Sequence, residues 1–135
     1  MKENKNDFDK CINEKSNYIK LDYTNQNIDI IKTCLGLLLE LKSKVLPYDF
    51  QRRKASFSHL KHKLEDESKT ITDKNIDSIL WAINYLKAFY NTKDTYIYFP
   101  DFINEIEKNK IIEHLKPCFY YFRSIQDDFR KRNTR

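Results

Sequence analysis

The chain has 135 residues, of which 40% are hydrophobic and 33% charged, and this balance is typical of one globular domain rather than a disordered segment. Its single glycine and three prolines allow few tight turns and exclude a glycine-rich loop for binding phosphate. A net charge of +5 at pH 7 is mild for this length. The longest apolar run, Cys34–Leu39, is too short to cross a bilayer and no signal peptide is visible, so we expect a cytoplasmic protein without a membrane partner.

The three cysteines, Cys11, Cys34 and Cys118, are far apart in the sequence, and no Cys-x-x-Cys pair occurs. An odd number of isolated cysteines argues against a disulfide framework and against a zinc site. Each cysteine has apolar neighbours, so we expect buried free thiols. We expect no metal and no cofactor.

Apolar residues return every three to four positions along the chain, which is the period of an amphipathic helix. The links between the apolar segments are short and polar, and short links favour antiparallel neighbours. The sequence therefore predicts an all-α fold: one domain over residues 1–135, built as a bundle of four to six helices that are mostly antiparallel. Residues 1–6 and 131–135 are expected to fray.

The first two helices are expected before Pro47. A weakly patterned segment predicts a helix over about residues 7–18. A broad apolar stripe predicts a second helix over about residues 25–46, capped by Thr24 or Asn25. Pro47 is expected to end it, because its ring clashes with the preceding turn.

The third helix is expected to begin at a capping Asp49 and to run to about Glu65. The fourth helix carries the strongest apolar pattern, over residues 76–90, and is expected to be central. Thr70 and Asp73 have the spacing of a capping box at its start.

The last third of the chain leaves one alternative open. Residues 96–99 are expected to form an extended or helical connector, and Pro100 suits the first turn of a fifth helix. Pro117 either kinks this helix or separates it from a last one. Across all helices, five side chains are predicted to lie in the core: Leu38, Phe57, Ile79, Ile83 and Phe122.

Positive charge gathers in the third helix and at the carboxyl end of the chain. Five basic and no acidic residues lie between Phe50 and Leu64. On a helix, Arg52, His59 and Lys63 fall within about 40° of one another, with Ser56 beside them. Such a face is either a phosphate-contacting surface or a solvated helix face. The candidate nucleic-acid-binding residues are Arg52, Ser56, His59, Lys63, Arg130, Lys131 and Arg132.

Arg53 lies within the apolar stripe of the same helix and leaves two interpretations open. It forms an ion pair with an acidic residue, for which Glu105, Glu107 and Glu113 are available, or it lays its stem along the core. In the second interpretation the guanidinium reaches water.

The spacing from Arg52 or Arg53 to His59 resembles that of the HEPN domains, small helical ribonucleases in which Arg and His act on the scissile phosphate. The resemblance covers only these residues and implies that the arginine would hold the phosphate while His59 transfers a proton. The polar residue that usually follows the arginine is replaced by Arg53 or Lys54. On a helix, Arg53 points about 120° away from His59, and Arg52 lies about 10 Å from it along the axis. A monomer is therefore expected to show no nuclease activity.

We expect a non-catalytic module that binds a macromolecule, with no catalytic residue assigned. The first expectation is a protein partner, with the chain acting as an inhibitor, an immunity or antitoxin factor, or a small subunit of a complex. The alternative is a nucleic-acid-binding module that uses the basic third helix and the carboxyl-terminal tail. A HEPN-like ribonuclease is third. Self-association is left open.

Overall fold

The computed structural model describes residues 18–41, 46–67, 70–91 and 105–133, and 80% of these residues are helical. They contain four helices: α2 (Gln26–Leu39), α3 (Tyr48–Glu65), α4 (Asp73–Tyr90) and α6 (Glu105–Arg132). No strand occurs in the described ranges, where the only β-type pairing is an isolated antiparallel bridge. The predicted all-α class is confirmed. None of these helices combines the length and the apolar character that a membrane span requires.

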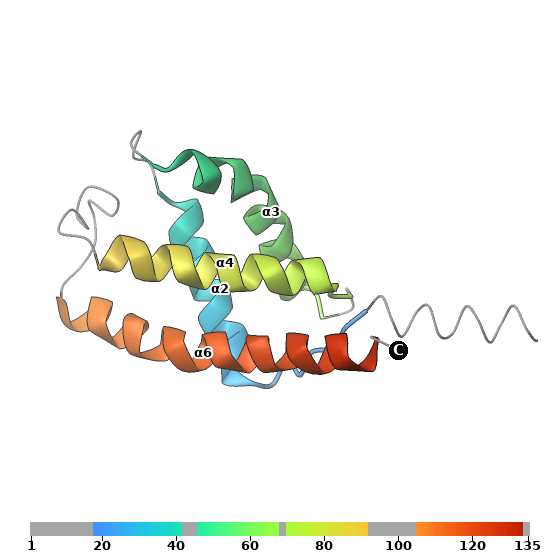
Figure 1. Cartoon of the computed structure of the whole chain (residues 1–135). Coiled ribbons are helices and arrows are strands. Elements are labelled where there is room, and N and C mark those ends of the chain that lie inside the picture. Colours follow the sequence, from blue (N-terminus) through green and yellow to red (C-terminus); the bar gives the residue numbers. More distant parts are fainter. Residues whose placement is uncertain (1–17, 42–45, 68–69, 92–104, 134–135) are drawn as a thin grey trace, which may run out of the picture.

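Helices α2, α3 and α6 pack against α4, which contacts each of them. In Figure 1, α4 and α6 run side by side in opposite directions. Helix α2 passes behind both at a steep angle, and α3 lies above α4, on the side away from α6. The start of α4 therefore lies beside the end of α6, where Arg130 forms an ion pair with Asp73. The antiparallel arrangement is plain for α4 and α6, whereas α2 crosses them.

The second helix begins where the sequence predicts and ends earlier. The Asn25 side chain caps α2 by accepting a hydrogen bond from the Asn27 backbone N–H at 2.9 Å. The helix ends at Leu39, so the prediction that Pro47 ends it is wrong. Leu41 and Leu46 remain buried beyond the helix end, so the apolar stripe indicated burial and not helical continuation.

The third helix ends at Glu65 as predicted, but its start differs. Pro47 is the N-cap residue and makes no side-chain capping bond, and Asp49 lies within the first turn instead of capping it. A proline suits this boundary because it has no backbone N–H to leave unpaired. Asp49 is still favourable there, because a carboxylate in the first turn faces the positive end of the helix dipole.

The cap of α4 lies two residues later than the sequence suggests. The Thr72 hydroxyl accepts from the Asn75 backbone N–H at 3.2 Å, and the Asn75 side chain accepts from the Thr72 N–H at 2.9 Å. The preceding residue, Ile71, is buried and accepts a backbone hydrogen bond from Ile19 at 2.6 Å. This pairing holds Ile71 in an extended conformation, so the predicted cap at Thr70 is wrong.

The last helix settles the alternative at Pro117. Helix α6 is continuous over 28 residues with Pro117 inside it, so the proline does not separate two helices. The helix also continues through Arg132, so residues 131 and 132 are helical instead of frayed. Three expectations lie outside the described residues: the fraying of residues 1–6, the helix over 7–18 apart from its last residue, and the connector over 96–99 with the helix start at Pro100.

The core contains the side chains that the sequence predicts. Leu38, Phe57, Ile79, Ile83 and Phe122 are each 0% exposed. Cys34 and Cys118 are buried free thiols, as expected, whereas Cys11 lies outside the described residues. Burial raises the pKa of the Cys34 thiol well above its ordinary value and raises the pKa of Cys118 to about 12. Both thiols therefore stay protonated near neutral pH and act as small apolar core groups.

Replacing Ile83 by alanine tests the central position of α4. Because the side chain is fully buried, its truncation removes apolar contacts and leaves a cavity, so we expect a loss of about 2–5 kcal/mol in the free energy of unfolding. The neighbouring Asn84 is exposed, and Asn84→Ala serves as a control that should change stability little. Urea denaturation followed by circular dichroism measures both, and equal midpoints for the two variants would contradict a central α4.

Replacing Thr72 by alanine tests the observed cap. The substitution removes the hydroxyl that accepts from Asn75, and we expect it to cost about 1 kcal/mol of stability. Thr70→Ala, at the exposed position suggested by sequence alone, should cost much less. The same denaturation assay measures both variants, and a larger loss for Thr70→Ala would show that the helix starts earlier.

Candidate functional site

The basic face predicted on α3 is present as a helix surface. Arg52, Ser56 and His59 are exposed, and Lys63 is half-buried. The Lys63 ammonium donates a hydrogen bond to the Asn75 side-chain oxygen at 3.2 Å, which ties it to the first turn of α4. The face thus keeps Arg52, Ser56 and His59 in contact with solvent, while Lys63 has a contact within the chain.

The predicted bases at the carboxyl end of the chain lie in the last turn of α6. Arg130 donates two hydrogen bonds to the Asp73 carboxylate, at 3.2 and 3.0 Å, and lies 3.4 Å from Asp77. Hydrogen bonding to Asp73 raises the pKa of Arg130. The buried Gln126 completes the group by donating to Asp77 at 2.6 Å. Arg130 therefore joins α6 to α4 and is already paired with carboxylates of the chain.

The two basic segments converge on the same place. Lys63 of α3 contacts Asn75, and Arg130 of α6 contacts Asp73, and both acceptors belong to the first turn of α4. Arg132 lies exposed in the same last turn of α6 as Arg130 and Lys131. The structure thus brings the candidate residues of two segments near one helix start, where the carboxylate of Asp73 offsets part of their charge.

The guanidinium of Arg53 stacks on an aromatic ring of α4, a contact that neither sequence interpretation included. Its guanidinium carbon lies 4.2 Å from the centroid of the Trp81 ring on α4, in cation–π geometry. Its Nε is buried without a hydrogen-bond partner, and no ion pair to Arg53 occurs among the described residues. The guanidinium of Arg53, for which the sequence left two arrangements open, is therefore stacked on an exposed indole.

Trp81 is the functional candidate that sequence reasoning missed. It is 43% exposed on α4, about 160° around the helix from the buried Ile83. Tyr85, one turn further along, lies 5.7 Å from the indole and 5.2 Å from the buried Phe50 between ring centroids. The signal available in the sequence was a tryptophan placed on α4 away from the main apolar stripe. Its stacking partner could not be identified without the packing of α3.

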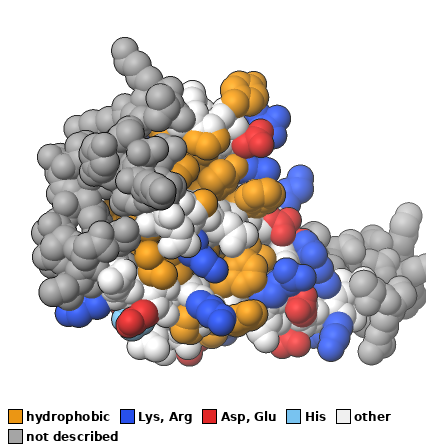
Figure 2. Space-filling model, turned by 60° about the vertical axis from the view of Figure 1, so that its left-hand side comes forward, with side chains coloured by type: hydrophobic (Ala, Val, Ile, Leu, Met, Phe, Trp, Pro, Cys, Tyr) orange, Lys and Arg blue, Asp and Glu red, His pale blue; other side chains and the backbone are white. Residues whose placement is uncertain are grey.

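The other exposed aromatic side chains lack this support. Within the described residues, the large exposed hydrophobic side chains are Tyr18, Tyr48, Trp81 and Tyr120. Of these, Trp81 alone carries a stacked cation in the part of the chain that the structure describes. Figure 2 shows a face on which uncovered hydrophobic side chains lie among Lys, Arg, Asp and Glu, so apolar and charged groups of both signs alternate on this surface.

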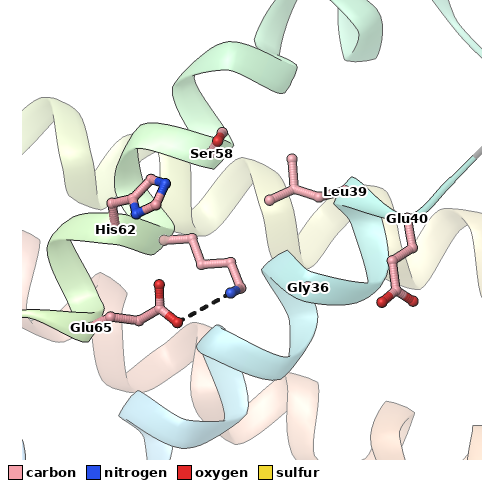
Figure 3. A pocket seen from close by; sticks show the side chains of 7 residues that line it. Gly36, Leu39, Glu40, Ser58, His62 and Glu65 are labelled. Carbon is pink, nitrogen blue, oxygen red and sulfur yellow. Dashed lines mark hydrogen bonds and ion pairs between the residues drawn. The ribbon is translucent and has the colours of Figure 1, made fainter.

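A hollow between α2 and α3 is the other place where reactive side chain types gather (Figure 3). Lys61 forms an ion pair with Glu65 at 3.2 Å across one turn of α3. Ser58 and His62 line the same hollow, but no hydrogen bond joins them within the described residues. A hydroxyl nucleophile needs a base in hydrogen-bond contact, so this arrangement does not define a nucleophilic site. Seven residues line the hollow: Gly36, Leu39, Glu40, Ser58, Lys61, His62 and Glu65.

The same test applies to the resemblance to HEPN ribonucleases. Arg53 is turned to Trp81, and no hydrogen bond joins His59 to Arg52 in the part of the chain that the structure describes. No group of three or more His, Cys, Asp or Glu side chains that could hold a metal ion occurs within the described ranges either. The ribonuclease hypothesis therefore keeps only its support from sequence spacing.

Comparisons of this chain with protein-family models, with curated proteins and with solved structures find no match. We therefore infer a function from the chemistry of the surface formed by Trp81 and Arg53, which we call the Trp81 surface. It comprises the exposed indole on α4, the stacked guanidinium from α3 and the supporting Tyr85 ring.

The contact between Arg53 and Trp81 is directly measurable, because Trp81 is the single tryptophan of the chain. Arg53→Ala uncovers the ring face that the guanidinium shields, so we expect the emission maximum to shift to longer wavelength as water reaches the indole. Arg52→Ala removes the same charge from the adjacent, exposed position and should leave the emission unchanged. Equal spectra for the wild type and Arg53→Ala would contradict the stacked geometry.

Proposed function

We propose that this chain is a non-catalytic, protein-binding helical module that acts through the Trp81 surface, as an inhibitor, an immunity or antitoxin factor, or a small subunit of a complex. One observation carries the proposal: an indole that is 43% exposed is held in place by a stacked arginine. Tryptophan and arginine are enriched among the residues that dominate the binding energy of protein interfaces.

The packing of Tyr85 against Trp81 favours binding because it restricts the motion of the indole before a partner binds. Tyr85 lies against the indole, and its own ring packs at 5.2 to 6.2 Å from the buried Phe50, Phe57 and Phe89. A side chain that is already restrained loses little conformational entropy in a complex, so more of its contact energy appears as affinity.

The same geometry favours a protein over a nucleic acid. A base stacks on an open aromatic face, but the guanidinium of Arg53 covers one face of Trp81. Phosphate binding draws on several uncompensated bases, whereas Arg130 is already paired with the Asp73 carboxylate. The nucleic-acid alternative retains the exposed Arg52, Ser56 and His59 of α3 and is tested below together with the proposal.

We further propose that the whole chain forms one helical bundle, mostly antiparallel, in the cytoplasm. The antiparallel pair α4 and α6 supports the first part. Two free buried thiols, Cys34 and Cys118, are compatible with a reducing compartment, where free thiols are the rule.

The experiment compares three forms of the tagged full-length chain in a lysate of the cells that naturally contain it. We expect the wild type to retain a protein that Trp81→Ala loses, because hot-spot aromatic residues contribute about 2 kcal/mol or more to binding. Tyr120→Ala removes an aromatic side chain that is 60% exposed on α6 and should retain the same protein.

Treatment of the lysate with nuclease separates the alternatives. A protein partner should remain bound after treatment. Retention that disappears with nuclease, or that persists in Trp81→Ala, would contradict the proposal, and nuclease-sensitive retention would favour the nucleic-acid module.

A further inference from the structure

The bases of α3 divide into two groups by what they already contact. Three of them donate to acceptors within the chain: Lys54 to the Leu41 carbonyl at 3.3 Å, Lys61 to Glu65 at 3.2 Å and Lys63 to Asn75 at 3.2 Å. Arg52 and Arg53 make no hydrogen bond or ion pair within the described residues. Lys61 is thus paired with a carboxylate, Lys54 and Lys63 donate to neutral oxygens, and Arg52 and Arg53 are the two cations of α3 whose donors have no acceptor among the described residues.

The stacking of Arg53 leaves the bonding edge of its guanidinium available. A guanidinium donates hydrogen bonds in its own plane, so an indole lying against its flat face does not occupy them. Nε is buried without a partner, but the side chain as a whole is only half-buried, and its two Nη atoms are not among the buried unpaired atoms. The outer edge of the fork thus faces solvent beside an exposed apolar ring.

From this geometry we infer that the Trp81 surface takes an acidic segment of a protein partner, in which an Asp or Glu carboxylate binds Arg53 and an adjacent apolar side chain packs on Trp81. This inference rests on the proposed protein-binding function and specifies the chemistry of the partner. The planar fork matches a carboxylate with two parallel hydrogen bonds. Bound in this way, the carboxylate neutralises a charge that has no counterion among the described residues.

The charge at this site is too small to favour a nucleic acid. Duplex DNA carries one negative charge for about every 1.7 Å of its axis, and proteins that bind it neutralise many phosphates. The Trp81 surface offers the single cation of Arg53, which suits one carboxylate. The three lysines of α3 already donate to acceptors in the chain.

The test selects short random peptides, displayed on phage, on the immobilised full-length chain. We expect the recovered peptides to carry Asp or Glu next to an apolar residue. Each is then labelled and titrated by fluorescence anisotropy against the wild type and its variants. Arg53→Gln, and replacement of the peptide's acidic residue by its amide, should each weaken binding roughly tenfold or more, because each removes a charge-assisted hydrogen-bond pair.

Two further variants exclude simpler explanations. Arg53→Lys keeps the charge but lacks the planar fork, so it should also weaken binding, which a general attraction of opposite charges would not predict. Lys116→Gln removes an exposed base on α6 and should leave binding unchanged. Thermal unfolding followed by circular dichroism verifies that each variant is folded at the assay temperature.

The outcomes separate this inference from the proposed function. If Trp81→Ala abolishes peptide binding while Arg53→Gln and the amide peptides bind as well as the wild-type pair, the acidic chemistry is wrong and the protein-binding surface stands. If Trp81→Ala leaves peptide binding intact, or if no peptide is enriched, both the inference and the role of the Trp81 surface as a binding site are contradicted. Displacement of the peptide by single-stranded oligouridylate at equal concentration would overturn the inference in favour of phosphate recognition.

Discussion

The burial of α4 is the constraint on which the rest of the structure depends. Eight of its side chains are buried, including Ile76, Ile83 and Tyr90, and no single neighbour can cover so wide an apolar surface. Helices α2, α3 and α6 therefore pack against it from three sides. One strip of α4 remains open to solvent, and Trp81 lies on that strip. The candidate site is thus the part of the central helix that the fold leaves uncovered.

Arg53 shows how packing of the core creates a charged surface. Phe50 and Phe57 anchor α3 against Tyr85 and the neighbouring apolar face of α4, and the arginine between them is carried to Trp81. A stacked guanidinium contributes roughly 0.5–2 kcal/mol, depending on its desolvation. An unpaired buried donor such as its Nε costs about 1–3 kcal/mol. These opposing terms are similar in size, so stability alone does not explain why an arginine occupies this position.

Arg130, in contrast, shows why a count of basic residues does not predict which positive charges stay without a partner. Sequence places Arg130 in a cluster of positive charge, but the fold brings Asp73 and Asp77 of α4 to its fork. The ion pair is exposed, so it contributes little to stability, yet it fixes where the charge is directed. Because α4 and α6 are antiparallel neighbours, the acidic residues at the start of α4 lie beside the basic end of α6, although the two segments are far apart in the sequence. The charge of a basic segment therefore stays available to a ligand only where packing leaves it without a carboxylate partner, as at Arg52 and Arg53 among the described residues.

The sequence by itself determined the helical class, most helix positions and the five predicted core side chains, because these follow from the local period of apolar residues. It also placed Arg52, Ser56 and His59 on one exposed face of α3, because residues three to four apart share a helix face. Only the tertiary structure decided the rest. The cap at Thr72 depends on the pairing of Ile19 with Ile71. The role of Arg130 depends on its contact with Asp73, and the candidate site depends on the approach of Arg53 to Trp81. Each joins residues distant in the chain, and a local periodicity carries no information about which helices become neighbours.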